Sequence, residues 1–115
     1  ESPVDNKTES WDGSSWTETG DLNDARTFLS GSGNSNTSAL AFGGDTPGGT
    51  SNTEEWNGSS WTEVAELGTA RSHGGSGGSQ SAGIYFGGWT HPGTTTATEE
   101  WNVPTTNLTL ASTTA

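Results

Sequence analysis

Residues 53–63 read TEEWNGSSWTE, and this stretch sets the architecture because the chain repeats it. Residues 8–18 read TESWDGSSWTE, and residues 98–102, TEEWN, begin the same stretch a third time. The first Trp of each copy keeps one spacing, since 56 − 11 and 101 − 56 both equal 45. A fixed period of this length is typical of supersecondary units that stack on their neighbours. The sequence therefore predicts an array of repeats rather than one globular core.

Each complete copy of the stretch predicts a β-hairpin. Asp-Gly and Asn-Gly tolerate the positive φ of a tight turn, and they occupy residues 12–13 and 57–58. The turn consists either of these two residues or of four, 12–15 and 57–60. In both cases strand alternation places the two indoles of a hairpin on one face. The tryptophans expected to share a face are Trp11 with Trp16 and Trp56 with Trp61, and Trp101 begins the third copy.

Two apolar stretches between the copies predict buried strands. Residues 39–44 and 82–88 each end in a glycine pair, and short apolar runs bounded by glycine are typical of buried strands. The weaker strands expected at 27–33 and 72–78 consist largely of small residues, which indicates a close approach of backbones. The glycines of the two pairs are Gly43, Gly44, Gly87 and Gly88.

Composition limits both the core and the partners. Only 25% of the 115 residues are hydrophobic, so the six Trp side chains must supply much of the buried surface. Three basic residues against fourteen acidic ones give a net charge of −11, which excludes nucleic acid and anionic membranes as favourable partners. The chain has no Cys, and we find no apolar run of the roughly 20 residues that span a bilayer.

No pattern of catalytic, metal-binding or cofactor-binding residues emerges. Residues 74–78, GGSGG, satisfy G-x-S-x-G, but the nucleophile motif needs a strand-to-helix turn that a glycine-rich stretch does not provide. The two histidines, His73 and His91, lack the spacing of a zinc site. A calcium site built from loop Asp and Asn oxygens stays open, although no EF-hand pattern is present. We expect no enzyme activity and no cofactor.

The charged residues of the repeat suggest structural tasks. The pairs Glu54-Glu55 and Glu99-Glu100 alternate across a strand, and we interpret them as part of a solvated face. Arg26 and Arg71 stand 45 residues apart in a chain whose only other basic residue is Lys7. We expect each arginine to form an ion pair or charge-assisted hydrogen bond between repeat units. The candidate partners are Glu18 and Glu63.

The aromatic residues divide into repeated and non-repeated positions. Repeated Trp residues either pack one unit against the next or stack on sugars, and recurrence in every copy favours packing. Aromatic residues that do not recur are better ligand candidates, particularly in loops. These candidates are Trp89 and His91, in a loop without a counterpart in the first repeat, and Tyr85, which replaces Ala41.

The repeat has an apolar strand that ends in Gly-Gly, a Trp strand about a dozen residues later, a second Trp five residues on and then an Arg. This order of residues resembles the kelch repeat. That family folds as a β-propeller with one four-stranded blade per repeat. The resemblance implies second strands at 39–44 and 82–88, third strands at 53–57 and 98–102, and a fourth strand at 60–64. It also implies that Arg26 and Arg71 open the innermost strands.

The residue sequence of the repeat further resembles kelch-like arrays in structural proteins of tailed phages. The resemblance implies a non-enzymatic structural or adhesion module of a virion (tail, fibre or decoration) or of another extracellular assembly. Its partners would be further repeats or other protein chains. The alternative is a glycan-binding propeller lectin, whose partners would be surface glycans.

The repeat divides the single segment of residues 1–115 into three parts. Residues 1–52 hold a half-blade and the first repeat, residues 53–97 the second repeat, and residues 98–115 a terminating half-repeat with one last strand at 107–112. Thr106 occupies the place of the second Trp, so the repetition stops there. Because propellers have about 4 to 8 blades, the chain is a piece of a longer array or several copies close a ring. We favour the longer array.

Overall fold

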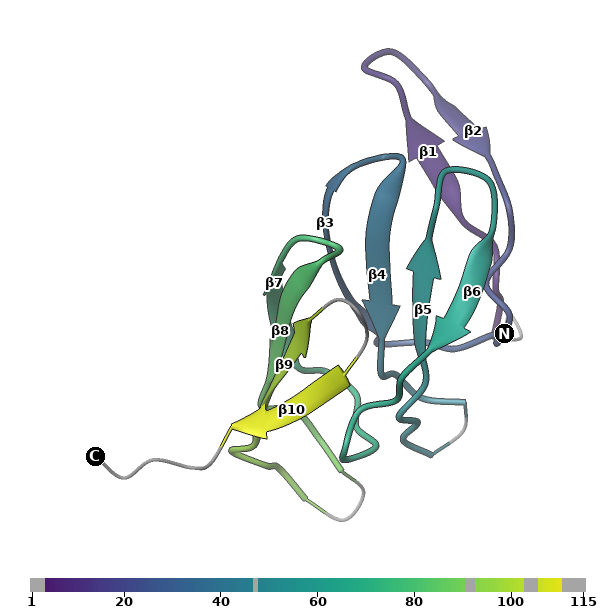
Figure 1. Cartoon of the computed structure of the whole chain (residues 1–115). Coiled ribbons are helices and arrows are strands. Elements are labelled where there is room, and N and C mark those ends of the chain that lie inside the picture. Colours follow the sequence, from purple (N-terminus) through teal and green to yellow (C-terminus); the bar gives the residue numbers. More distant parts are fainter. Residues whose placement is uncertain (1–3, 47, 91–92, 103–105, 111–115) are drawn as a thin grey trace.

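A computed structural model describes residues 4–46, 48–90, 93–102 and 106–110 of the chain. Every regular element among these residues is a β-strand, which confirms the all-β prediction (Figure 1). No part of the described chain forms a helix able to cross a membrane. The strands are β1 Glu9–Trp11, β2 Trp16–Glu18, β3 Ser30–Ser35, β4 Ser38–Phe42, β5 Thr53–Trp56, β6 Trp61–Val64, β7 Gly75–Gly78, β8 Ala82–Phe86, β9 Thr98–Asn102 and β10 Thr106–Leu110.

The strands form three antiparallel sheets, each joining strands that are consecutive in the sequence. The β1-β2 hairpin is followed by the four-stranded sheets β3-β4-β5-β6 and β7-β8-β9-β10. Figure 1 shows the three sheets side by side in chain order. The expected second, third and fourth strands are confirmed within one or two residues at each end. The last strand, expected at 107–112, is observed as β10 up to Leu110, and residues beyond it lie outside the described chain.

One expectation about the inner strands is wrong. Arg26 and Arg71 do not open β3 and β7, because these strands begin four residues later, at Ser30 and Gly75. Both arginines lie instead in the connectors that lead into the four-stranded sheets. The physical reason is their role as buried charges, described below.

The hairpin loops contain four residues rather than two. Asp12 Oδ1 accepts hydrogen bonds from the backbone N–H groups of Ser14 and Ser15, both at 2.8 Å, and Gly13 adopts a φ of +100°. These bonds lower the pKa of the Asp12 carboxyl, because they favour its charged form. Asn57 accepts the equivalent bonds in the second copy. The loop is therefore specified locally by the DGSS and NGSS sequences.

This loop length pairs the two Trp residues of each hairpin directly across the strands. Trp11 is the register partner of Trp16, and Trp56 of Trp61. In both pairs the ring centroids are 5.3 Å apart. The prediction that each pair shares one face is confirmed.

The two four-stranded sheets pack around one apolar core. Phe42 of β4 stacks on Tyr85 of β8, with ring centroids 5.1 Å apart. The remaining members of this core are Leu40, Leu67 and Trp101. Because each sheet contributes only a few apolar side chains, the large aromatic rings supply most of the contact.

The inner strands β3 and β7 approach each other closely where their residues are small. Ser30 Oγ donates to Gly74 O and Ser76 Oγ donates to Gly31 O, both at 2.7 Å. The backbones also approach closely outside these strands, since a Cβ atom at Gly43, which follows β4, would lie 2.6 Å from the carbonyl oxygen of Arg71 in the connector before β7. The glycine-rich composition thus permits the close approach of backbones that the sequence indicated.

Candidate functional site

Each four-stranded sheet forms one buried Arg–Glu ion pair with the connector that leads into it, and the two pairs occupy equivalent repeat positions. Arg26 Nη2 lies 3.4 Å from Glu54 Oε2, and Arg71 Nη2 lies 3.0 Å from Glu99 Oε2. All four side chains are at most 1% exposed. Each pair joins a connector to the third strand of the sheet into which that connector leads. The expected ion pairs exist, but each lies within one four-stranded sheet and the connector that leads into it rather than between two sheets.

The identities of the acidic partners correct two expectations. The arginines pair with Glu54 and Glu99 rather than with Glu18 or Glu63. The two partners are buried, so the interpretation of both Glu-Glu pairs as solvated faces is wrong for their first members. Glu55 remains partly exposed, as the alternation of a strand requires.

The guanidinium groups also bind backbone carbonyls of the loop before the third strand. Arg26 donates to Asn52 O at 2.9 Å, and Arg71 donates to Ala97 O at 2.7 Å. Burial lowers the pKa of Arg26, and the charge of Glu54 opposes this effect. An arginine stays protonated in such a setting. The group therefore acts as a fixed structural cation.

The carboxylates accept backbone N–H groups from the connector. Glu54 binds the amides of Asn23 at 2.7 Å and Asp24 at 3.3 Å. Glu99 binds those of Gly68 at 2.6 Å and Thr69 at 3.2 Å. Each buried carboxylate thus has an arginine and two amides as partners, which satisfies the buried charge.

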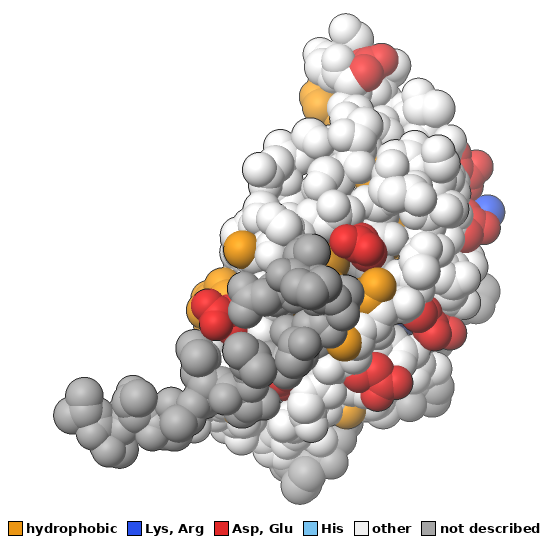
Figure 2. All heavy atoms as spheres, viewed as in Figure 1, with side chains coloured by type: hydrophobic (Ala, Val, Ile, Leu, Met, Phe, Trp, Pro, Cys, Tyr) orange, Lys and Arg blue, Asp and Glu red, His pale blue; other side chains and the backbone are white. Residues whose placement is uncertain are grey.

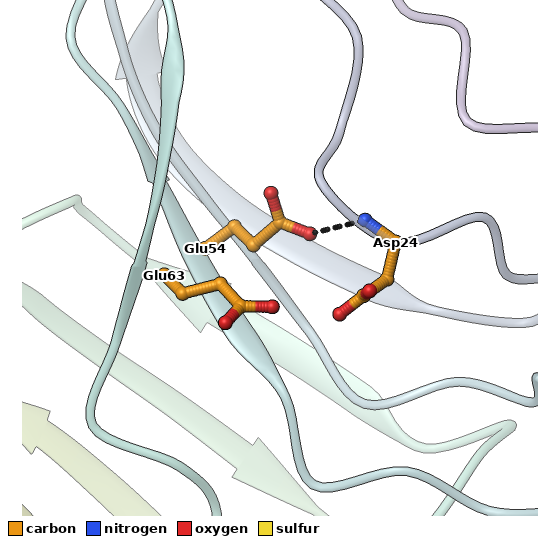
Figure 3. Close-up of side chains that lie close together, drawn as sticks. All are labelled: Asp24, Glu54 and Glu63. Atoms are coloured by element: carbon orange, nitrogen blue, oxygen red, sulfur yellow. Dashed lines mark hydrogen bonds between the residues drawn. The ribbon is translucent and has the colours of Figure 1, made fainter.

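A cluster of three carboxyl groups lies beside the first of these pairs. Oxygen atoms of Asp24 on the connector, Glu54 on β5 and Glu63 on β6 lie within 4.8 Å of one another (Figure 3). The hydrogen bond with Asp24 raises the pKa of Glu63, and burial and neighbouring negative charge act in the same direction. The equivalent positions of the next repeat hold Thr69 and Leu108, so the cluster does not recur.

The chemistry of this cluster follows from how its members are already bonded. Glu54 is neutralised by Arg26 and the two amides, and Asp24 accepts a hydrogen bond from Asn52 Nδ2. The remaining member, Glu63 on the edge strand β6, has a raised pKa because of its hydrogen bond with Asp24, so the arrangement favours its protonated form.

Trp89 lines a surface hollow of about 520 Å³ together with His73, Gly88, Thr94 and Thr95. The indole is 38% exposed. An apolar ring and two threonine residues around one hollow suit a ligand with both an apolar face and polar groups.

The His73 ring also stacks on Phe28, with centroids 4.0 Å apart. Both residues adopt left-handed backbone, with φ of +62° and +56°, which is unusual for bulky side chains and costs energy. They stand 45 residues apart, so the period alone places them at one repeat position. The weak strands expected at 27–33 and 72–78 include both residues, but β3 and β7 begin only at Ser30 and Gly75, so Phe28 and His73 lie in the connectors.

Of the other predicted ligand residues, Tyr85 does not join Trp89. Tyr85 is 1% exposed, and its hydroxyl oxygen accepts a hydrogen bond from the Gly74 amide at 3.2 Å. Its ring also lies under the guanidinium of Arg71, 4.8 Å from the centroid. Tyr85 is therefore a core residue, and we do not retain it in the ligand site. His91 lies outside the described residues.

The two ends of the stack of sheets leave repeated aromatic residues uncovered. Trp56 and Trp101 are 5% and 2% exposed, whereas Trp11 at the same repeat position is 47% exposed. At the other end, Phe42 is 2% exposed and its counterpart Phe86 before the second Gly-Gly pair is 46% exposed. Acidic side chains are scattered over the visible surface rather than gathered in one patch (Figure 2).

No model of a known protein family matches the chain, and none of the curated proteins compared with it matches either. Its function is therefore inferred from the repeat, the buried ion pairs and the uncovered surfaces.

Proposed function

We propose that the chain is a segment of a kelch-like β-propeller that serves as a non-enzymatic structural or adhesion module, in a virion or another extracellular assembly. The observation that carries this proposal is the exposure of repeated interface residues at both ends of the stack. Trp11 and Phe86 are about half exposed, while Trp56 and Phe42 at the corresponding repeat positions are buried. The inner hairpin of its own sheet covers Trp56, and Tyr85 of the next sheet covers Phe42. Further units of the same kind would bury both ends.

The architecture supports an array in a second way. Each Arg–Glu pair lies inside one four-stranded sheet and its connector, so that both of these sheets have their own buried polar network. The apolar contacts lie between units, as between Phe42 and Tyr85. Such a division of contacts is typical of repeat proteins, in which stability depends on each unit and on the interface with its neighbour.

The experiment is a series of chains that carry additional tandem copies of residues 53–97. We expect the thermal midpoint to rise with each copy, because each one buries an exposed end, and the gain to stop once a ring closes at about 4 to 8 blades. Calorimetry gives the midpoint, and light scattering gives the mass. A midpoint that does not change as copies are added would contradict the proposal.

The hollow at Trp89 supports the second candidate function, a glycan-binding lectin. An indole face stacks on the apolar face of a pyranose, and Thr94 and Thr95, which also line the hollow, are the nearby residues able to make polar contacts. The test is a glycan array followed by titration of any sugar that binds. Trp89→Ala should abolish binding, while Trp16→Ala, which removes an exposed indole elsewhere, should leave it unchanged. Equal binding by both variants would contradict this assignment.

A further inference from the structure

The two-stranded β1-β2 hairpin corresponds in sequence to the outer half of the four-stranded sheet β3-β4-β5-β6. Residues 8–18 match residues 53–63, so β1 corresponds to β5 and β2 to β6. In the two complete sheets the third strand also pairs with the strand before it, β5 with β4 and β9 with β8. Within the described chain, β1 pairs with β2 alone. Its other edge therefore presents backbone groups that a strand can bind.

Glu9 occupies the repeat position of the two buried carboxylates. It stands 45 residues before Glu54, and Glu54 stands 45 residues before Glu99. Those two side chains each bind an arginine and two connector amides, whereas Glu9 is exposed. Its register partner across the hairpin, Glu18, forms an exposed ion pair with Lys7 at 3.3 Å. This end of the hairpin thus has an acidic group suited to one more cation.

Trp11 shows which contact the hairpin lacks. Its counterparts Trp56 and Trp101 donate from Nε1 to carbonyl oxygens in the turn of the inner hairpin, at Asn36 O (3.0 Å) and Gln80 O (2.9 Å). The same inner hairpins help to bury these indoles to 5% and 2% exposure. A corresponding hairpin beside β1 would cover Trp11 and accept its indole N–H.

We propose that the open edge of β1 and the face with Glu9 and Trp11 bind one more inner β-hairpin of this repeat type, with Glu9 as the receptor for the arginine that precedes it. The occupant is defined by its chemistry: a connector with an arginine four residues before a strand rich in small residues, then an apolar strand that ends in Gly-Gly. Residues 20–52 have this chemistry in the present chain. The inference rests on the proposed function as an array of repeats.

The test places a second copy of residues 20–52 directly before Thr8, which keeps the 45-residue register because Thr8 corresponds to Thr53. We expect the thermal midpoint to rise by several degrees. The exchange of the Trp11 indole proton with deuterium, followed by NMR, should slow by about tenfold or more, since each factor of ten needs only about 1.4 kcal/mol of protection. Trp56 is the internal reference for a folded chain.

Glu9→Gln distinguishes the contribution of the ion pair to the thermal midpoint from the contribution of covering the hairpin face. In the extended chain this variant should lose much of the gain in midpoint, because it leaves the added arginine without its carboxylate. In the unextended chain it should change little, because Glu9 is exposed there. An extended chain whose gain fully survives Glu9→Gln would overturn the role of Glu9.

Two further outcomes would overturn the docking site. If neither the extension nor a peptide of residues 20–52 added to the intact chain protects Trp11, the site does not take this occupant. If the intact chain is a dimer by light scattering and its Trp11 is already protected, the face belongs to a second copy. Tandem copies of residues 53–97 test the proposed array separately from the docking site at β1. These copies can stabilise the chain even when no hairpin docks on β1.

Discussion

Arg71 Nη2 lies 3.0 Å from Glu99 Oε2 in the interior of the second four-stranded sheet, and the two residues are 28 positions apart in the chain. Arg26 and Glu54 repeat this relationship at the same separation. Each pair ties a connector, a loop and a strand together through hydrogen bonds of both partners. The repeat is therefore organised around a buried charge as well as around its tryptophans.

Arg71→Ala should destabilise the chain by about 3–5 kcal/mol, because it leaves the Glu99 carboxylate buried without its cation. Urea unfolding followed by tryptophan fluorescence measures the loss. Lys7→Ala is the control, since Lys7 is 58% exposed in its ion pair with Glu18 and its removal should leave the free energy of unfolding nearly unchanged. Equal effects of the two substitutions would show that the burial of Arg71 does not matter for stability.

Trp56→Ala should cost about 3–5 kcal/mol, because it removes a large side chain that is only 5% exposed. Trp16→Ala is the control for the loss of an exposed indole, in the preceding copy of the hairpin. Trp16 is 64% exposed, so its loss should change the free energy of unfolding by about 0.5 kcal/mol or less. A large effect at Trp16 in a monomeric sample would mean that this indole is covered in solution.

How far the sequence predicts this structure depends on whether a contact is local. The pairing of Trp56 with Trp61 follows from strand alternation and a short loop, and the sequence predicts it correctly. The partner of Arg71 depends on which strand passes over the connector, and strand alternation alone does not reveal that. The 45-residue period does indicate the partner, because Arg71 stands one full period after Arg26 and Glu99 stands one full period after Glu54.

The candidate ligand site shows the same limit. Trp89 is predicted because it does not recur, and the structure places it at the surface beside His73. Tyr85 is chosen by the same rule but fills the space between the two sheets, where Gly43 leaves room for its ring. An aromatic residue that does not recur can therefore serve packing as well as binding, and only the three-dimensional contacts distinguish these two roles.

Gly43→Ala should destabilise the chain for two reasons. Gly43 has a φ of +70°, which costs an L-residue roughly 1–2 kcal/mol, and the new Cβ would lie 2.6 Å from Arg71 O. Gly13→Ala is the control for backbone strain alone, since its φ is +100° and a Cβ there meets nothing within 4 Å. Chemical denaturation should give the larger loss for Gly43→Ala. Equal losses would contradict a close approach of the two backbones.

Glu63→Gln should make the stability of the chain less sensitive to pH. The hydrogen bond with Asp24 raises the pKa of Glu63 above the ordinary value of 4.5 in the folded state. A raised folded-state pKa means that the protonated group stabilises the fold fully below pH 4.5, and that this contribution is lost as pH rises through the folded-state pKa. The Glu63 side chain is exposed, so we expect a change in the pH dependence rather than a large loss or gain of stability.

The measurement is the thermal midpoint of the native chain and of Glu63→Gln between about pH 4 and pH 8, because comparing the two cancels the contributions of the other carboxylates. At neutral pH the carboxylates of Asp24 and Glu63 repel each other, whereas the amide introduced by Glu63→Gln keeps a donor toward Asp24 without the charge. The native chain should therefore lose stability relative to the variant as pH rises above 4.5. Glu55→Gln is the control, since Glu55 points to the opposite face of β5 from Glu54 and lies outside the cluster. Parallel pH curves for the native chain and Glu63→Gln would contradict a raised pKa of Glu63 in the folded state.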